Sequence, residues 1–173
     1  MKTGKQPKPK TCRDCPLYGD GTGFVPDDIR DDAKVFILMQ NPGRSEEVGE
    51  RVTGYIQGKP VTERCSPSPA IGATGYLQDT SFLPLADLTR ERVCVGNVLR
   101  CRWKGTNDVP PVGVLHEAQR HCEQYLQIPD AAEVIVAQGR VAWEFLNGGS
   151  GFSITNWRGF ISADLAYGRP VYG

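Results

Sequence analysis

Histidine is almost missing from this chain of 173 residues, and neither long apolar runs nor an excess of one charge is present. Only His116 and His121 occur, so a zinc site would have to rely mainly on cysteine. No apolar run approaches the ~20 residues that a membrane-spanning helix needs, and the basic amino terminus lacks the apolar segment of a signal peptide. We therefore expect a soluble, cytoplasmic monomer with no membrane partner.

Charge is balanced overall, because 20 Lys and Arg are matched by 20 Asp and Glu. Net charge therefore gives no sign of a nucleic-acid partner, although acids cluster at residues 27–32 and bases at residues 2–10. Residues 1–10 are polar, basic and proline-bearing, which predicts a flexible tail. With 39% hydrophobic residues in the chain, residues 11–173 fit one domain with a core large enough to fold alone.

Six cysteines are present, and nothing indicates export to a compartment where they would form disulfides. Four of them form a pattern, in which the pair Cys12 and Cys15 is followed much later by Cys101 and Cys122. Two thiolates separated by two residues can bind one metal or cluster, and four cysteines favour a 4Fe-4S cluster or a zinc site. The pattern does not choose between these two, and Cys101 and Cys122 as incidental buried residues are the third interpretation.

A short apolar run that ends in an abrupt turn stands out in the first quarter of the chain. Residues 34–39 are rich in Val, Phe, Ile and Leu and predict a buried strand, which Pro42 and Gly43 end sharply. Gln40 and Asn41 are thereby left at the carboxyl end of the strand, where open α/β sheets bind their ligands. An ordinary turn between a strand and a helix is the simpler interpretation of the same residues.

Strands and helices alternate along the rest of the chain. Strands are predicted at residues 93–99, 133–138 and 152–160, a last apolar pulse begins at Pro170, and helices are predicted at residues 75–88 (disturbed by Pro84), 112–126 and 140–146. Residues 44–64 are irregular and punctuated by glycine, which suits a loop that reaches over a ligand. The alternation predicts an α/β fold with a parallel sheet of four strands covered on both faces.

Four ordered blocks carry a resemblance to a known family: CRDCPL near the start, NPGRSEE at the end of the first strand, GNVLRCR, and HC on a later helix. Their combination resembles the family 4, iron-sulfur type of uracil-DNA glycosylase, and the similarity runs from Cys12 to Gly159. The resemblance implies a three-layer αβα sandwich with a central four-stranded parallel sheet and a 4Fe-4S cluster held by Cys12, Cys15, Cys101 and Cys122. It also implies removal of uracil from single- or double-stranded DNA, a step of base excision repair.

By the same resemblance, Gln40, Asn41, Pro42 and Gly43 occupy the first active-site motif, which usually reads Glu-Ala-Pro-Gly. Gln40 replaces the usual Glu, and Asn41 makes the motif similar to the Asn-Pro-Gly turn of the mismatch-specific uracil and thymine glycosylases, whose Asn holds the attacking water. A neutral amide can orient water but cannot take its proton, so the reaction would be dissociative, with uracil leaving first. Asn97 matches the residue that hydrogen-bonds the Watson–Crick edge of the flipped uracil, and a capping or turn Asn is the alternative.

Two other parts of the chain depart from the family pattern. The segment from Gly58 to Val61 resembles Gly-Arg-Pro-Phe, whose aromatic ring stacks on the base; Val61 has no ring, so Tyr55 becomes the candidate for stacking. A second motif, His-Pro-Ser or His-Pro-Thr, should follow a strand like that at residues 169–172, and the sequence ends before it. Either the sequence is a truncated form of a longer chain or the protein has lost a main catalytic element. We expect the first, with residues 11–173 as a single glycosylase-like domain that is truncated at its carboxyl end.

Three functions are open from the sequence. The first is excision of uracil, with Gln40 and Asn41 positioning water and the cluster orienting Arg100 and Arg102 toward phosphate. The second is a catalytically impaired module that uses the same iron-sulfur fold to bind uracil, DNA or another protein. The third is a zinc-stabilised α/β domain with no role on nucleic acids.

Overall fold

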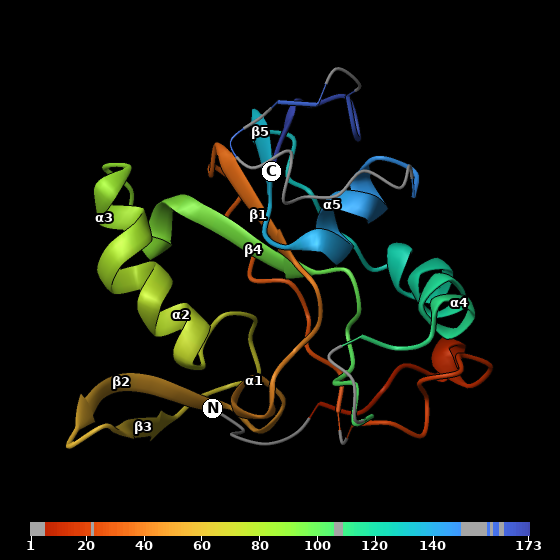
Figure 1. Ribbon diagram of the computed structural model, residues 1–173, viewed down its shortest axis with the longest axis horizontal. Helices are drawn as coiled ribbons and strands as arrows, with labels where there is room; N and C mark the ends of the chain where they lie inside the picture. Colours follow the sequence, from red (N-terminus) through yellow and green to blue (C-terminus); the bar gives the residue numbers. More distant parts are fainter. Residues whose placement is uncertain (1–5, 22, 106–108, 150–158, 160, 163–164) are drawn as a thin grey trace.

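The computed structural model describes residues 6–21, 23–105, 109–149, 159, 161–162 and 165–173. Its central element is a four-stranded parallel sheet with the order β4-β1-β5-β6 (Figure 1). The strands are β1 (Val35–Met39), β4 (Val93–Asn97), β5 (Val134–Ala137) and β6 (Val171–Tyr172). The sheet confirms the α/β fold expected from the sequence. The strand expected at residues 152–160 lies outside the described residues, except for Gly159.

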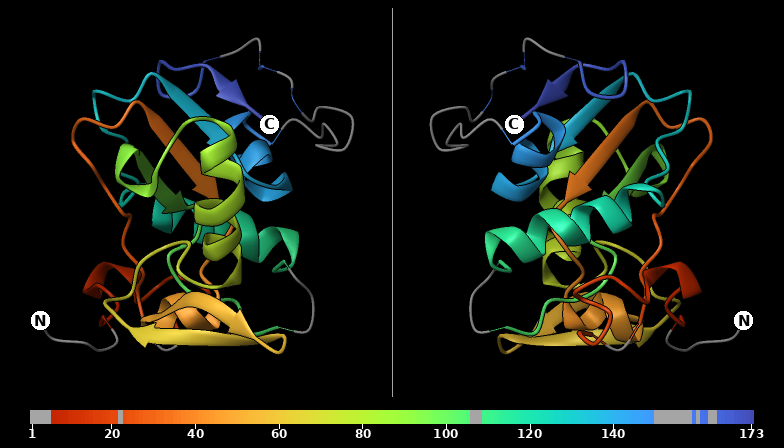
Figure 2. Two further views of the ribbon diagram at one scale, coloured as in Figure 1. Left: turned by 90° about the vertical axis from the view of Figure 1, so that its left-hand side faces the viewer. Right: turned by 90° about the vertical axis from the view of Figure 1, so that its right-hand side faces the viewer.

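Helices cover both faces of the sheet. They are α2 (Ala73–Leu77) and α3 (Leu83–Leu85) on one face and α4 (Val112–Glu123) and α5 (Arg140–Leu146) on the other. From the central β1 the chain crosses in one direction to β4, and then returns past β1 to β5. Because crossover connections are almost always right-handed, this reversal places the later helices on the opposite face. In the left view of Figure 2, α2 and α3 lie in front of the sheet, and in the right view α4 lies in front of it.

Alternating side chains of the strands build two hydrophobic clusters. Phe36 and Leu38 of β1 lie in the cluster that includes residues of α4 and α5. Ile37 of β1 and Val95 of β4 lie in the other, together with Leu83 of α3. Full burial of such a side chain contributes about 1.5–3 kcal/mol to folding. The alternation also decides which cluster the polar residues at the strand ends face.

Residues 44–64 form a short helix and a β-hairpin, so the irregular loop expected from the sequence was wrong. The elements are α1 (Arg44–Val48), β2 (Glu50–Ile56) and β3 (Lys59–Arg64), the last two paired antiparallel. At the hairpin turn, Gln57 and Gly58 have positive φ angles of 51° and 75°. This is the conformation of a two-residue turn that matches the twist of paired strands. Gly58 therefore marks a tight turn rather than an open loop.

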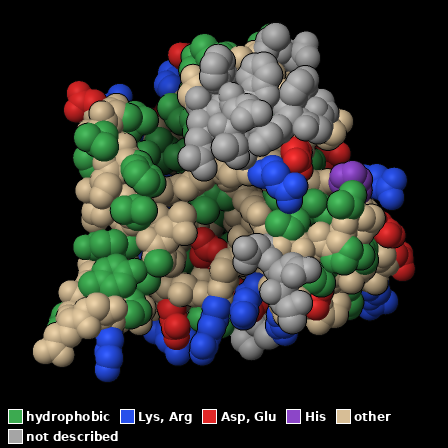
Figure 3. Space-filling view, viewed as in Figure 1, with side chains coloured by type: hydrophobic (Ala, Val, Ile, Leu, Met, Phe, Trp, Pro, Cys, Tyr) green, Lys and Arg blue, Asp and Glu red, His purple; other side chains and the backbone are tan. Residues whose placement is uncertain are grey.

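The helix expected over residues 75–88 is present as a helical segment with a widened turn inside it. Between α2 and α3 lies the π-helical turn η2 (Gln78–Phe82). Pro84 lacks an N–H, and its ring would clash with the carbonyl four residues back in a regular α-helix, so a wider turn accommodates it. Figure 3 shows hydrophobic side chains over this segment, where Leu77, Phe82 and Leu85 are exposed.

The described residues also form two short 3-10 helices, η1 (Lys10–Cys12) and η3 (Arg90–Arg92). Cys12 is the last residue of η1, and η3 directly precedes β4. None of the helices formed by the described residues combines the length and the apolar character needed to cross a bilayer.

Gly75 in α2 is required by a close backbone contact, since a Cβ there would lie 1.7 Å from the Ala70 carbonyl oxygen. We expect Gly75→Ala to lower the free energy of unfolding by about 1–3 kcal/mol, the usual cost of overpacking, as measured by urea denaturation. Gly113 is the matched control, because it is exposed in α4 and its added Cβ would meet nothing within 4 Å. Gly113→Ala should raise the free energy of unfolding by about 0.5–1 kcal/mol. Equal effects of the two changes would contradict the contact with Ala70.

Candidate functional site

The ends of β1 and β4 bring three predicted site residues to one edge of the sheet. Met39, the last residue of β1, is in register with Asn97, the last residue of β4. The pairing continues beyond the strands, because the Leu99 N–H donates to the Gln40 carbonyl at 2.9 Å. Gln40 and Asn41 therefore leave β1 beside the residues that follow Asn97, at the carboxyl edge where α/β sheets bind ligands.

The side chains of Gln40 and Asn41 form a pair of amides. Gln40 Nε2 donates to Asn41 Oδ1 at 2.7 Å, and Asn41 Nδ2 donates to the Pro42 carbonyl at 3.0 Å. These contacts fix the direction in which the Asn41 amide faces. An amide oxygen has two lone pairs, so Asn41 Oδ1 can accept one more hydrogen bond. Asn41 lines an open hollow of about 270 Å³ between this turn and the start of α2.

Asn97 is buried with an unpartnered amide. The residue is 1% exposed, and neither Oδ1 nor Nδ2 has a hydrogen-bond partner among the described residues. By the alternation of β4, its side chain lies on the same face as Val95, toward α2 and α3. Each buried polar group left unpaired costs about 1–3 kcal/mol. A donor and an acceptor are thus available here for a polar ligand.

Glu46 was missed in the sequence, yet it holds the turn that carries Asn41. The residue is 5% exposed, and its carboxylate accepts hydrogen bonds from the backbone N–H groups of Gly43 and of Ala70, the latter at 2.6 Å. Burial raises the pKa of this carboxyl, and the N–H donors act against that rise. Gly43 caps α1 and Glu46 is its third residue. The signal in the sequence that could have identified Glu46 was an acidic residue three positions after the residue that caps the helix.

The two candidates for stacking on a base lie on the hairpin. Val61 of β3 is 39% exposed and Tyr55 of β2 is 45% exposed. The Tyr55 ring meets Tyr76 of α2 edge-on, with 5.4 Å between ring centroids and 71° between planes. Thr74, two residues before Tyr76, lines the hollow that contains Asn41. Stacking by Tyr55 on a base stays a prediction.

Four of the six cysteines lie near enough to influence one another electrostatically. Cys12 ends η1, Cys15 follows it, Cys101 lies in the loop after β4, Cys122 lies on α4, and all four are buried. Burial is the main cause that raises the pKa of the Cys101 thiol to about 12 and that of Cys122 to about 11, and the neighbouring thiols act in the same direction. Burial therefore disfavours the thiolate forms of Cys101 and Cys122 unless a cation binds them.

Backbone groups already contact two of these sulfur atoms. The Arg100 N–H donates to Cys122 Sγ at 3.4 Å, and a backbone hydrogen bond from Leu17 lowers the pKa of Cys15 against the effect of burial. Such contacts typically surround metal-bound thiolates. In the part of the chain that the structure describes, no three His, Cys, Asp or Glu side chains are grouped around one point as a single metal ion requires.

Arg100 is buried, which corrects the expectation that it faces phosphate. It is 1% exposed, and its guanidinium forms a two-pronged ion pair with Asp27, with Nη2 at 2.8 Å from Oδ2. Nη1 donates to the Asn97 carbonyl at 2.5 Å, and Nη2 donates to the Tyr125 carbonyl at 3.2 Å. Burial raises the pKa of Asp27 to about 6, and the attraction of Arg100 opposes that rise. Arg100 therefore positions the backbone at Asn97, while Arg102 is partly buried.

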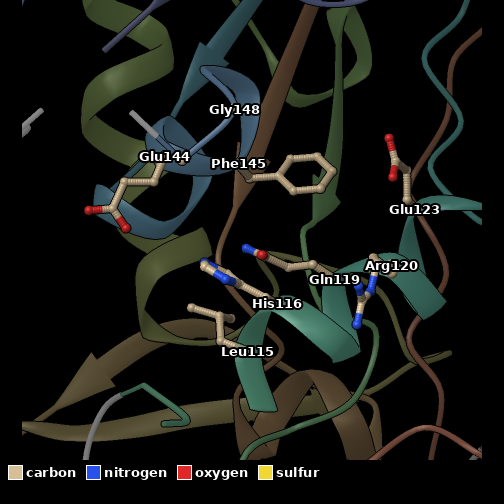
Figure 4. Close-up of a pocket in the computed structure, with 9 residues that line it drawn as sticks. Leu115, His116, Gln119, Arg120, Glu123, Glu144, Phe145 and Gly148 are labelled. Carbon is tan, nitrogen blue, oxygen red and sulfur yellow. The ribbon is translucent and has the colours of Figure 1, made fainter. Parts of the chain in front are cut away.

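A second hollow, of about 280 Å³, lies between α4 and α5 (Figure 4). His116 and Gln119 border it from α4, and Glu144 and Phe145 border it from α5. Of the described residues that line this hollow, none is Gln40, Asn41 or Asn97. His116 thus stands apart from Gln40, Asn41 and Asn97, in keeping with its predicted place on the helix that carries Cys122.

Comparisons with known proteins add the following. No protein-family model matches the chain. It is 31% identical over 139 residues to the type-4 uracil-DNA glycosylase of Archaeoglobus fulgidus, and the aligned region covers 79% of this chain and 58% of that protein. It is 30% identical over 156 residues to the type-4 uracil-DNA glycosylase of Thermotoga maritima, and the aligned region covers 87% of this chain and 68% of that protein. The chain thus spans only part of the length of these curated relatives.

Asp27→Asn should leave the buried Arg100 guanidinium without its anion. We expect the free energy of unfolding to fall by about 3–5 kcal/mol in urea denaturation, the range for breaking a buried ion pair. Glu133→Gln is the matched control, because it breaks the exposed pair between Lys34 and Glu133 (2.9 Å) and should cost less than about 1 kcal/mol. If the two variants lose the same small amount, the buried pair does not hold this region together.

Proposed function

Since the chain belongs to the type-4 uracil-DNA glycosylase family, we propose that it removes uracil from DNA by hydrolysing the N-glycosidic bond. The observation that carries the proposal is the buried, unpartnered amide of Asn97 at the sheet edge where Gln40 and Asn41 leave β1. The proposed substrate is single- or double-stranded DNA that contains uracil, and the protein acts as a cytoplasmic monomer.

Asn97 reads the base in this proposal. Uracil hides its Watson–Crick edge in a duplex, so it must be flipped out before a side chain can contact that edge. Asn97 Nδ2 then donates to uracil O4, and Asn97 Oδ1 accepts from uracil N3–H. Cytosine has a donor at position 4 and an acceptor at N3, so like groups would face each other. The hydrogen bond from Arg100 to the backbone carbonyl of Asn97 fixes the backbone that carries this side-chain amide.

Gln40 and Asn41 act on the water. Neither amide can accept a proton, so the bond between sugar C1′ and uracil N1 breaks first, and its electron pair leaves on uracil N1. A water that donates to Asn41 Oδ1 then attacks the electron-poor C1′, and its proton passes to solvent. Gln40 positions the acceptor through its 2.7 Å bond to Asn41 Oδ1. The products are free uracil and an abasic site.

We propose that Cys12, Cys15, Cys101 and Cys122 hold a 4Fe-4S cluster. Their fit rests on the burial of four neighbouring thiols and on the N–H groups that two of the sulfur atoms meet. Four cysteines would be the complete set of ligands for such a cluster, and zinc is the alternative cofactor. When bound, the cluster supplies a cross-link between the amino-terminal segment, the loop after Asn97 and α4.

Asn97→Ala tests the reading of the base. Wild-type protein should leave an alkali-labile abasic site in an oligonucleotide with one uracil, and should leave the matched cytosine oligonucleotide intact. Loss of two hydrogen bonds, each of about 1–1.5 kcal/mol, should lower kcat/KM for uracil roughly 30- to 150-fold.

The stability of the same variant is the control. Removing an unpartnered buried amide should leave thermal unfolding unchanged or raise its midpoint, so lost activity in a stable variant indicates reading of the base. No excision by wild-type protein at enzyme excess would refute the proposed activity.

Cys101→Ser should abolish binding of iron, because it removes one of four ligands from a buried site. The measurement is the iron content per chain, together with the brown colour of the purified protein. Cys65→Ser is the matched control, since Cys65 is a partly exposed free thiol outside this set, and it should keep full iron content. Zinc instead of iron in the wild-type protein would contradict the 4Fe-4S assignment.

A further inference from the structure

Lys8 ties the amino-terminal segment to the loop that follows Cys15. Its ammonium donates to the backbone carbonyls of Leu17 (3.1 Å), Tyr18 (2.6 Å) and Asp20. The nitrogen also lies 5.6 Å from the centre of the Tyr18 ring. An ammonium has three donors, and three carbonyls meet them, so the charge is held in a defined position.

This charge lies close to one of the four cysteines, because the Leu17 carbonyl accepts from Lys8 while a backbone hydrogen bond joins Leu17 to Cys15. Burial is the main influence on the pKa of Cys101, and Lys8 is the foremost influence that lowers it; Lys8 acts in the same direction on Cys15. The second cation at the site, Arg100, is paired with Asp27. Within the described ranges, no carboxylate forms an ion pair with Lys8. Among the described residues, the ammonium of Lys8 is therefore met by carbonyl dipoles and the Tyr18 ring and not by a carboxylate.

We propose that Lys8 is the counter-charge of the cluster-binding cysteines and raises the reduction potential of the cluster they hold. The inference rests on the proposed 4Fe-4S cluster, in which four thiolates make the loaded site negative. Uptake of one electron adds one more negative charge to the site. A fixed cation in a partly desolvated environment stabilises the more negative state more strongly than the oxidised state. Three carbonyls that hold the ammonium keep this effect constant.

Charge and shape can be separated by substitution at one position. Lys8→Met keeps much of the side chain's length but removes the charge, whereas Lys8→Arg keeps the charge with a different head group. Lys10→Met is the matched control, because it removes an exposed lysine from the same segment. The holo-proteins are compared by voltammetry, in which one electron passes from the electrode to the cluster and no proton is transferred.

We expect the reduction potential to shift to a more negative value in K8M and to stay close to that of the wild type in K8R and K10M. An unchanged potential in K8M overturns the inference. A shift of equal size in K8R also overturns it, because the effect would then follow the geometry of the loop and not its charge.

Retention of iron is the second measurement, for the case that K8M does not keep its cluster. Lys8→Gln is added here as a second variant that lacks the charge. Loss of iron from K8M and K8Q but not from K8R supports a role for the charge, and loss of iron from all three variants overturns it. Metal analysis of the wild-type protein comes first. A wild-type protein without iron refutes the cluster itself and this inference with it, which differs from a loaded wild type whose K8M variant is unchanged.

Discussion

The buried ion pair between Asp27 and Arg100 connects the parts of the chain on which both sites depend. Asp27 belongs to the segment before β1, and it also accepts the Gln127 N–H at 3.0 Å, beyond α4. Gly96 makes room for the pair, since a Cβ there would lie 2.4 Å from Asp27 Oδ1. Burying two charges costs several kcal/mol per ion unless further hydrogen bonds satisfy them. The Asn97 carbonyl supplies one of those bonds, so the arrangement that neutralises Arg100 also fixes the residue proposed to read the base.

Arg100 and Asn97 are three residues apart and equally buried, yet their polar groups differ in a way that separates structure from function. The two terminal nitrogens of Arg100 donate to Asp27 and to two backbone carbonyls, and among the described residues only its Nε lacks a partner. Among the described residues, by contrast, both amide atoms of Asn97 lack a partner. Buried polar groups are nearly always paired in folded proteins, so an unpaired one calls for a role beyond folding. The proposed contact with uracil would supply that role by completing the hydrogen bonds of Asn97.

Local sequence patterns were enough to predict the layers of the fold and the edge that bears Gln40, Asn41 and Asn97. Apolar runs identify parallel strands, and the carboxyl ends of such strands must meet at one edge. The burial of Arg100 could not be predicted, because its partner Asp27 lies 73 residues away and sequence alone does not pair distant charges. Lys8 was hidden for a related reason, since a lysine in a basic terminal stretch is usually solvated.

Glu46 gives an electrostatic reason for a neutral side chain at Asn41. Asn41 and Glu46 line the same hollow, and burial already raises the pKa of Glu46. A carboxylate in place of Asn41 would face a like charge there, which would raise the pKa of both groups and leave part of them protonated and unable to act as a base. An amide oxygen accepts hydrogen bonds at any physiological pH. Holding a water in this way suits the proposed reaction, in which uracil leaves before the water attacks, because the attack on an electron-poor C1′ requires a correctly placed oxygen more than a strong base.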